Sequence, residues 1–371
     1  MAKKLRLGIL FGGRSAEHEV SVRSAANVMA AADPEKYEIV PIAITKDGRW
    51  QLGALPGGSQ TKPQIEEPEG RSVEVVPAAC PSGVGPLVPV EKSNARNSVG
   101  RLDVIFPILH GTFGEDGTVQ GLLELAGIPY VGAGVLGSAA GMDKEVMKRL
   151  FRERGLPIVP YVAIIRSEWE TAQRKTYLAV ERKFRYPVFV KPANLGSSVG
   201  ITKAHNRKEL EAALRTAADY DRKILVEKGI DGREIECAVL GNDSPIASVP
   251  GEVIPGREFY DYADKYLEDT AQLIVPAQLR PAQTKQVQRL AVEAFRAVDC
   301  AGMARVDFFL QKKTGRIYVN EINTIPGFTS ISMYPRMWAA SGIPYAKLID
   351  RLIELALERH REKTRIRYSL R

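Results

Sequence analysis

The stretch ARVDFFLQKKTGRIYVNEIN, residues 304–323, is the part of this sequence that most strongly decides the fold. Two apolar runs, ARVDFFL and IYVNEIN, flank the turn KKTG, and this arrangement predicts a β-hairpin. Because side chains alternate along a strand, Arg305 and Asp307 share one face of the first strand. Glu321 and Asn323 likewise share one face of the second. If the two faces coincide, three oxygen ligands and an arginine converge.

The converging oxygens of this hairpin have the chemistry of a magnesium site. Carboxylate and amide oxygens with open coordination positions suit Mg²⁺, which usually also binds waters and substrate phosphates. The alternative is a surface salt bridge between Arg305 and Asp307, with Glu321 solvated. The strand ARVDFFL is too apolar around its charges for an exposed strand. The pattern therefore favours a functional site.

A loop of small residues follows another apolar run, in KPANLGSSVGI at residues 191–201. It fits either a flap over a phosphate chain or a serine nucleophile, because GSSVG matches G-x-S-x-G. A nucleophile elbow leads into a helix, whereas this loop leads into the β-like segment GITKA. The downstream histidines, His205 and His360, have no convincing acid partner. These observations favour the phosphate flap.

The commoner nucleotide-binding loops are missing from the sequence. It has no Gly-Lys dipeptide, and no G-x-G-x-x-G follows its first strand. If the protein binds ATP, it does so in another way. Lys144 and Lys191 are the natural phosphate partners, and Glu227 and Glu234 could accept hydrogen bonds from an adenine amine or a ribose. Each of the four alone also fits an ordinary surface charge.

Composition excludes several classes of protein. The 371 residues are 44% hydrophobic and 26% charged, which is typical of a soluble globular protein with about two or three domains. No apolar stretch approaches the roughly 20 residues of a membrane span, and the start MAKKLRLGILFGG reads as a first strand rather than a signal peptide. Cys80, Cys237 and Cys300 are scattered, without zinc spacing, which indicates a reducing compartment and so the cytoplasm.

The net charge of +8 does not indicate a nucleic-acid partner. Basic residues are spread along the chain except in the tail RHREKTRIRYSLR, which we interpret as a solvated helix end. No zinc finger or aromatic-basic RNA motif is present. An anionic small molecule remains as the partner that this charge would attract.

The first part of the chain predicts a doubly wound α/β domain. Strands at 5–11, 37–44 and 103–109, with a helix after the first, follow the order of a parallel sheet. The segment from 53 to about 100 is rich in glycine and proline, and we expect an irregular, exposed insertion rather than another core element. The first domain is expected to end near residue 132.

The rest of the chain predicts two α+β units. The first contains one helix over 135–154, a long polar helix before YPVFVK, and a compact set of strands. The second contains antiparallel strands, among them one over 246–254, then a helix over 282–298 and the hairpin. Two helices end the chain.

The motifs together resemble the D-alanine–D-alanine ligases of the ATP-grasp superfamily. The matching segments span nearly the whole chain, and several are specific to this family. They are FGGRSAEHEVS, HGTFGEDGTVQGLLE, GMDK, KPANLGSSVG, FYDYADKY, ARVDFF and NEINTIPGFTSISMYP. The resemblance implies three domains, at 1–132, 133–227 and 228–371, with the insertion of the longer members at 53–100 and a lid loop at 256–270.

The resemblance also implies the residues that bind the substrates. The first D-alanine would be bound by Glu17, His110 and Glu115. The nucleotide would be bound by Lys144, Lys191, Ser198, Glu227, Lys228, Gly229, Ile230, Glu234 and Lys265. The second D-alanine carboxylate would be received by the segment with Ser332 and Met333.

For catalysis, the resemblance implies two Mg²⁺ ions, with Mn²⁺ as a substitute, bound by Asp307, Glu321 and Asn323, with Glu321 shared between the ions. Arg305 and the backbone N–H of Gly327 would face the oxyanion of the tetrahedral intermediate. Tyr266 belongs to the lid, and Ser197 would link it by hydrogen bonds to Glu17.

The implied reaction has two steps and serves peptidoglycan precursor synthesis. One D-alanine carboxylate attacks the γ-phosphate of ATP, and the amine of a second D-alanine then displaces phosphate from the D-alanyl phosphate. The alternatives are a ligase that joins D-alanine to D-lactate, another ATP-grasp carboxylate–amine ligase, or a non-catalytic nucleotide-binding module. Tyr266 favours dipeptide formation over the depsipeptide. The resemblance also implies a homodimer.

Overall fold

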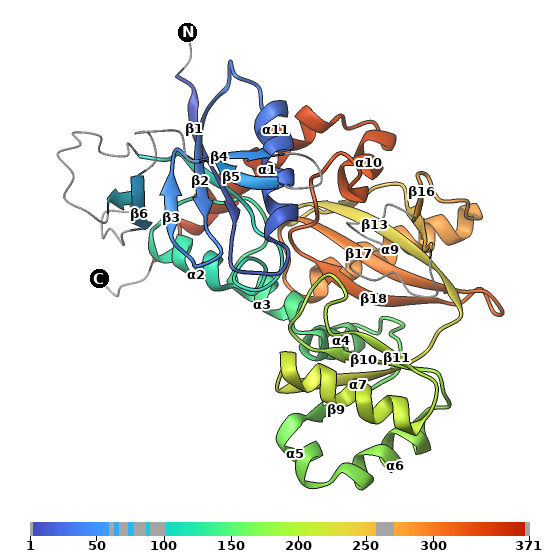
Figure 1. The fold of residues 1–371 in the computed structure, drawn as a ribbon. Coiled ribbons are helices and arrows are strands. Elements are labelled where there is room, and N and C mark those ends of the chain that lie inside the picture. The colour runs from blue at the N-terminus through green and yellow to red at the C-terminus, as the bar shows by residue number, and fades with distance from the viewer. Residues whose placement is uncertain are drawn as a thin grey trace.

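The computed structural model describes residues 3–58, 63–66, 73–77, 87–89, 101–256 and 271–367. The described strands form three larger sheets and one two-stranded sheet. Figure 1 shows the N-terminal elements at one end of the molecule and the elements around α7 at the other. Lys265 and Tyr266 lie outside the described residues, as does most of the expected lid at 256–270. No described helix is long and apolar enough to cross a membrane.

The first sheet contains the parallel strands that the sequence predicts. β1 (Leu5–Gly12) lies between β2 (Tyr37–Ile44) and β8 (Val104–Ile108) and pairs in parallel with both. Every residue of β8 is buried, as is typical of a parallel strand covered on both faces. Helix α1 (His18–Ala31) packs on β1, so Glu17, the residue before α1, is held at the carboxyl end of β1.

The insertion contributes to this sheet, and the expectation that it adds no core element was wrong. β6 (Val73–Pro77) pairs with β3 (Trp50–Leu52) and with β7 (Leu87–Pro89), which extends the sheet to the order β7-β6-β3-β2-β1-β8. Val75 is 1% exposed within the core. Strands of three to five residues are too short to show a clear alternation of apolar and polar residues. In a segment rich in glycine and proline they are therefore not recognised from the sequence. β4 (Leu55–Gly58) and β5 (Pro63–Glu66) form a separate pair.

The single helix expected over 135–154 is two helices. α3 (Val135–Met142) ends and α4 (Lys144–Glu153) begins at Asp143, which has extended backbone angles. The Asp143 carboxylate accepts hydrogen bonds from the N–H groups of Glu145 and Val146, so it caps α4. This break places Lys144 in the first turn of α4. Helices α2 (Thr118–Leu125) and α3 precede it along the chain, after the first sheet.

The second sheet is antiparallel and has the order β11-β10-β12-β9. Its strands are β9 (Tyr161–Ile165), β10 (Val188–Pro192), β11 (Thr202–Ala204) and β12 (Lys223–Lys228). Helix α7 (Arg207–Tyr220) packs on it. The long polar helix expected before β10 is interrupted and forms α5 (Arg166–Thr171) and α6 (Gln173–Lys183).

The third sheet contains the hairpin and has the order β16-β15-β13-β17-β18. Its strands are β13 (Gly232–Gly241), β15 (Gly251–Ile254), β16 (Gln272–Ile274), β17 (Gly302–Gln311) and β18 (Ile317–Asn323). The expected strand over 246–254 is split, because β14 (Ile246–Ala247) and β15 pair with different parts of β13. Helix α9 (Pro281–Ala297) packs on the sheet.

The C-terminal helices return to the first sheet. α10 (Met333–Ala340) packs on β13, and α11 (Tyr345–Lys363) contacts α1 and β8. Asp350 of α11 accepts hydrogen bonds from Lys36 Nζ at 2.6 Å and from Tyr37 Oη at 2.9 Å. One hydrophobic core therefore extends from β1 to α11 and joins the two ends of the chain.

Candidate active site

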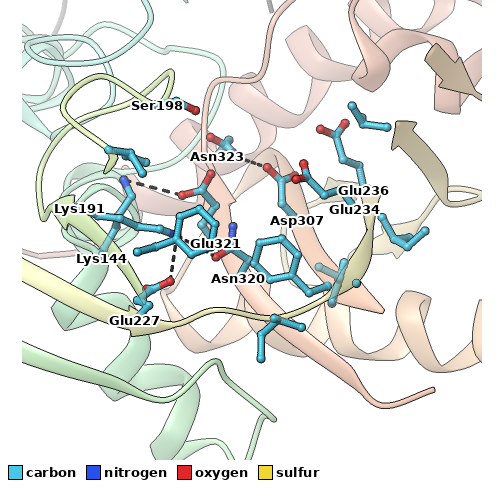
Figure 2. A pocket seen from close by; sticks show the side chains of 18 of the residues that line it. Lys144, Lys191, Ser198, Glu227, Glu234, Glu236, Asp307, Asn320, Glu321 and Asn323 are labelled. Carbon is cyan, nitrogen blue, oxygen red and sulfur yellow. Dashed lines mark hydrogen bonds and ion pairs between the residues drawn. The ribbon is translucent and has the colours of Figure 1, made fainter. Parts of the chain in front are cut away.

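A cavity of about 740 Å³ lies between the second and third sheets. Its two sides have opposite charge. Figure 2 shows Lys144, Lys191 and Glu227 on the side of the second sheet, and Asp307, Glu321 and Asn323 on the hairpin. We call these sides the lysine wall (Lys144, Lys191 and Glu227) and the acidic wall (Asp307, Glu321 and Asn323). Six residues predicted as nucleotide or metal partners are thereby brought together.

The hairpin of the acidic wall forms as the sequence predicts. Arg305 of β17 lies opposite Asn323 of β18, and Asp307 lies opposite Glu321. All four line the cavity, so the two polar faces coincide, which was the condition for the four side chains to converge. The register then shifts, because Phe308 pairs with Val319, and Asn320 is skipped in the ladder as a β-bulge.

The arginine of the hairpin forms a bidentate ion pair with its neighbour. Arg305 Nε and Nη2 each lie 2.7 Å from an oxygen of Asp307, and Glu236 Oε2 lies 3.3 Å from Arg305 Nε. The ion pair that the sequence offered as an alternative is thus present. However, its side chains are 20% and 15% exposed and line the cavity, so it is not an ordinary surface pair. Asn323 Nδ2 also donates to Asp307, at 3.0 Å.

The acidic wall fits a hard divalent cation. Among the described residues no three His, Cys, Asp or Glu side chains cluster as a closed metal site. Two carboxylates and an amide oxygen instead provide a partial set, which suits an ion that completes its coordination with water and phosphate. Because Asn323 donates through its amide nitrogen, its oxygen is the atom that would ligate the ion.

On the lysine wall, Lys144 and Lys191 are both held by protein acceptors. Lys144 Nζ donates to the carbonyl oxygen of Leu195 at 2.6 Å and lies 3.7 Å from Glu321 Oε2. Lys191 Nζ lies 2.9 Å from Glu227 Oε2 and 3.4 Å from Asn320 Oδ1. Both lysines are less than a tenth exposed, yet both line the cavity. Their charges are therefore partly desolvated and directed at the same space.

A third lysine, which the sequence analysis missed, lies behind Glu227. Lys148 Nζ is 3.0 Å from Glu227 Oε1 and donates to the carbonyl oxygen of Asn320 at 3.1 Å. Burial lowers the pKa of Lys148, against the attraction of Glu227. Burial opposes ionisation of Glu227 too, but Lys148 and Lys191 outweigh it and hold the pKa of the carboxyl below its usual value. The only sequence signal was the position of Lys148 one turn after Lys144.

Glu17 meets the small-residue loop as predicted. Ser197 Oγ donates a hydrogen bond to Glu17 Oε1. A Cβ atom at Gly196 would lie 2.8 Å from Glu17 Oε2, and one at Gly111 would lie 2.6 Å from it, so a side chain at either position would displace the carboxylate. Gly111 also has a φ of 73°, which favours glycine. Ser197 and Ser198 have φ of 48° and 61°, which is uncommon for residues other than glycine. The loop is therefore held in an unusual conformation against Glu17.

His110 and Glu115 lie behind this contact. His110 is 4% exposed, with Nδ1 3.0 Å from the carbonyl oxygen of Ile325, and burial lowers its pKa. Glu115 accepts hydrogen bonds of 2.9 Å from the backbone N–H groups of Gly111 and Ile325. Burial, with Glu17 nearby, raises the pKa of Glu115 to about 8. The three predicted residues Glu17, His110 and Glu115 thus form one cluster beside the cavity.

The remaining predicted residues occupy two places. The first is a side of the cavity lined by Lys228, Gly229, Ile230 and Glu234. The second is the start of α10, where a Cβ atom at Gly327 would lie 2.7 Å from Ser332 Oγ. The Met333 side chain is 5% exposed within the core, so only its backbone can face a ligand. Lys265 and Tyr266 are outside the described residues.

The chain matches known proteins along its length. Residues 6–133 match the family model described as D-ala D-ala ligase N-terminus, and residues 150–354 match D-ala D-ala ligase C-terminus. A D-alanine–D-alanine ligase of Solibacter usitatus is 54% identical over 99% of both chains. One from Bacillus cytotoxicus is 50% identical over 99% of both.

Solved structures show the same likeness. The D-alanine–D-alanine ligase of Coxiella burnetii superposes with a TM-score of 0.83 at 40% identity, covering 98% of this chain and 97% of that one. A D-Ala:D-Ser ligase from Enterococcus faecalis superposes with a TM-score of 0.81 at 36% identity, covering 95% of this chain and 100% of the other.

Proposed function

The chain belongs to the D-alanine–D-alanine ligase family, and from this premise we propose how its residues perform the family's reaction. It is an ATP-dependent ligase with the ATP-grasp fold that joins two D-alanines for peptidoglycan synthesis and uses a divalent metal ion. The assignment of each residue, the metal count and the assembly are our proposals.

ATP would lie in the cavity between the second and third sheets. Lys144, Lys191 and Ser198 would bind its phosphates, and the segment from Lys228 to Ile230 would contact the adenine. Glu227 and Glu234 would accept hydrogen bonds from the adenine amine and the ribose, with Lys265 contributing from the lid. The support is that the described members of this set line one cavity of suitable size.

The acidic wall would hold two Mg²⁺ ions, with Mn²⁺ as a substitute, through Asp307, Glu321 and Asn323. Bound there, the metal would neutralise the phosphates and stabilise the charge that develops during phosphoryl transfer. The oxygen-only donor set of the hairpin supports this assignment.

The first D-alanine would be bound by Glu17, which would receive its ammonium group, with His110 and Glu115 behind. The support is geometric, because Glu17 and Glu115 lie together at Gly111 beside the cavity, where a carboxylate can pair with an ammonium group. The carboxylate of the second D-alanine would meet the N-terminal turn of α10 at Ser332 and Met333, where the backbone N–H groups favour an anion.

The reaction would then proceed in two steps. The carboxylate of the first D-alanine attacks the γ-phosphate of ATP and yields D-alanyl phosphate and ADP. The amine of the second attacks that carbonyl, and Arg305 and the N–H of Gly327 stabilise the oxyanion before phosphate leaves. The loop at Ser197 and the lid with Tyr266 would exclude water, which would otherwise hydrolyse the acyl phosphate.

The observation that carries this proposal is that the lysine wall and the acidic wall line one cavity. The test is ATP-dependent phosphate release, with product analysis, for D-alanine, L-alanine, D-lactate and D-serine. We expect D-alanyl-D-alanine from D-alanine alone and no turnover of L-alanine. A mixed product with D-lactate or D-serine as the preferred acceptor would replace the assignment of the second substrate.

Assembly and location follow from different observations. Leu125, Val135 and Leu136 are 75%, 42% and 63% exposed on the neighbouring helices α2 and α3, which supports a homodimer through this face. Light scattering in solution tests the homodimer, and Leu136→Glu is the variant expected to disrupt it.

ATP as a co-substrate supports a cytoplasmic enzyme. One main sheet in each of 1–132, 133–227 and 228–371 supports these limits as the domains.

A further inference from the structure

We propose that Lys148 is a positioning residue for ATP binding: it neutralises Glu227, so that the charge of Lys191 remains available to the phosphates. This inference rests on the proposed function, in which Lys191 binds ATP. It concerns a side chain that does not line the cavity and that no motif singled out.

The three charged side chains form a buried row. They come from three elements, Lys148 from α4, Glu227 from β12 and Lys191 from β10, and are 1%, 2% and 6% exposed. Each oxygen of Glu227 faces a different lysine, at 3.0 Å to Lys148 and 2.9 Å to Lys191. Only Lys148 is sealed from the cavity, so the row is closed at one end and open at the other.

The charge of the row explains why the sealed lysine is present. A buried Glu227 with Lys191 alone would be a neutral pair, and the carboxylate would cancel most of the field of Lys191 at the cavity. Desolvating a further lysine is costly unless it is paired. With Lys148 on the far oxygen the row has a net charge of +1, and its open end is an ammonium that faces the cavity.

Lys148 also fixes the backbone next to a proposed metal ligand. Its Nζ donates to the carbonyl oxygen of Asn320 at 3.1 Å, while Asn320 Oδ1 lies 3.4 Å from Lys191 Nζ. Asn320 is the bulged residue of β18 and precedes Glu321. The same lysine therefore connects the helix that carries Lys144 to the strand that carries Glu321, outside the cavity.

The test compares three variants of the full-length enzyme: Lys148→Met, Lys148→Met with Glu227→Gln, and Lys191→Met. Methionine keeps the apolar length of lysine, and glutamine keeps a carbonyl oxygen for the adenine amine. For each we would measure the Kd for ATP and for inorganic tripolyphosphate with Mg²⁺, the KM for ATP and for D-alanine, and the Tm. Tripolyphosphate has no adenine, so its Kd does not depend on the proposed contact of Glu227 with the adenine amine.

We expect Lys148→Met to raise the Kd and KM for ATP about 10- to 50-fold, as the loss of one charge about 7–12 Å from a phosphate charge implies at an effective dielectric constant of about 20. The KM for D-alanine should stay within about twofold. The double variant should regain most of the tripolyphosphate affinity, because Glu227→Gln removes the charge that Lys148 had compensated. A residue that only packs would not show this rescue.

The possible outcomes separate the two proposals. If Lys148→Met lowers the Tm but leaves ATP binding unchanged, or if the double variant binds tripolyphosphate more weakly than the single one, the inference is overturned. If Lys148→Met does not fold, the double variant decides: near-parental tripolyphosphate binding supports the inference, and lost tripolyphosphate binding contradicts it. If Lys191→Met binds ATP like the parent enzyme, the proposed role of Lys191 itself fails.

Discussion

The acidic wall and the lysine wall of the cavity are built in different ways. The acidic wall comes from one hairpin, β17 and β18, whose register alone brings Asp307 opposite Glu321. The lysine wall needs α4, β10 and β12, and its Lys191 meets the sealed Lys148 through Glu227. The acidic wall therefore depends on local alternation, and the lysine wall depends on how separate elements pack. Activity should therefore tolerate no chemical change in the ligands of the acidic wall. The function of the lysine wall should also depend on residues outside the cavity.

The largest effect is expected on the acidic wall. Glu321→Gln removes a carboxylate charge while keeping its shape, so the proposed metal site loses a ligand without loss of packing. Metal stabilisation of transferred phosphoryl groups is worth several kcal/mol, so kcat should fall about 10³-fold or more. Initial rates over a range of Mg²⁺ concentrations, with the Tm as a control for folding, measure this.

Near-normal turnover of Glu321→Gln at ordinary Mg²⁺ would remove the metal role from the hairpin. Glu293→Gln is a matched control, because Glu293 lies on α9 and is paired with Arg154 at 2.9 Å outside the cavity. It should keep the parental kcat.

Arg305 should give the next largest effect. In Arg305→Ala the developing oxyanion loses a donor, and loss of one such donor costs about 10²- to 10³-fold in kcat. Asp307 also loses its bidentate partner, so the Mg²⁺ dependence should shift as well. Single-turnover rates report the loss of the oxyanion donor, and the Kd for ATP with Mg²⁺ reports the change at Asp307. An effect confined to the KM for ATP would make Arg305 a phosphate clamp.

The two walls also differ in how well the sequence predicted them. Alternation placed the charges of the hairpin correctly, because neighbours in a hairpin are close in the chain. The bulge at Asn320 was not predictable, since it depends on packing rather than on period. Lys148 was missed because a buried lysine looks like a surface lysine until Glu227, 79 residues later, is placed against it. The split of the 135–154 helix was missed because Asp143, although Asp is a favoured N-cap residue, also fits an exposed position within one continuous helix.

A smaller effect is expected where the small-residue loop that follows Lys191 meets Glu17. Ser197→Ala removes the hydrogen bond to Glu17, and one such bond is worth about 0.5–1.5 kcal/mol net. The KM for D-alanine should therefore rise about 2- to 10-fold, with little change in the Kd for ATP. Steady-state kinetics with each substrate varied in turn measure this.

Ser198→Ala is the matched comparison, because Ser198 also has a positive φ but is proposed to contact phosphate. It should raise the KM for ATP rather than that for D-alanine. If both variants change the same KM, the two serines act through the loop as a whole, and Ser197 has no separate role in D-alanine binding.

The smallest effect on rate, and the most informative one on specificity, is expected from Tyr266→Phe. Tyr266 is outside the described residues, and its role is proposed from the family resemblance through Ser197 and Glu17. The change removes one hydrogen bond, worth about 0.5–1.5 kcal/mol, which is enough to loosen a lid but not to unfold the enzyme. Dipeptide synthesis should fall by less than about tenfold, and some D-alanyl-D-lactate should appear.

The pH dependence of that product decides what Tyr266 does. An amine must lose its proton before it attacks, whereas D-lactate offers a neutral hydroxyl at every pH, so the depsipeptide should appear mostly at low pH, where the amine is protonated. Product analysis with D-alanine and D-lactate together, across pH, measures the ratio. If D-lactate stays excluded at every pH, Tyr266 acts in closure alone. The choice of second substrate would then lie at the start of α10, beside Ser332, where the bound carboxylate would fix the nucleophile.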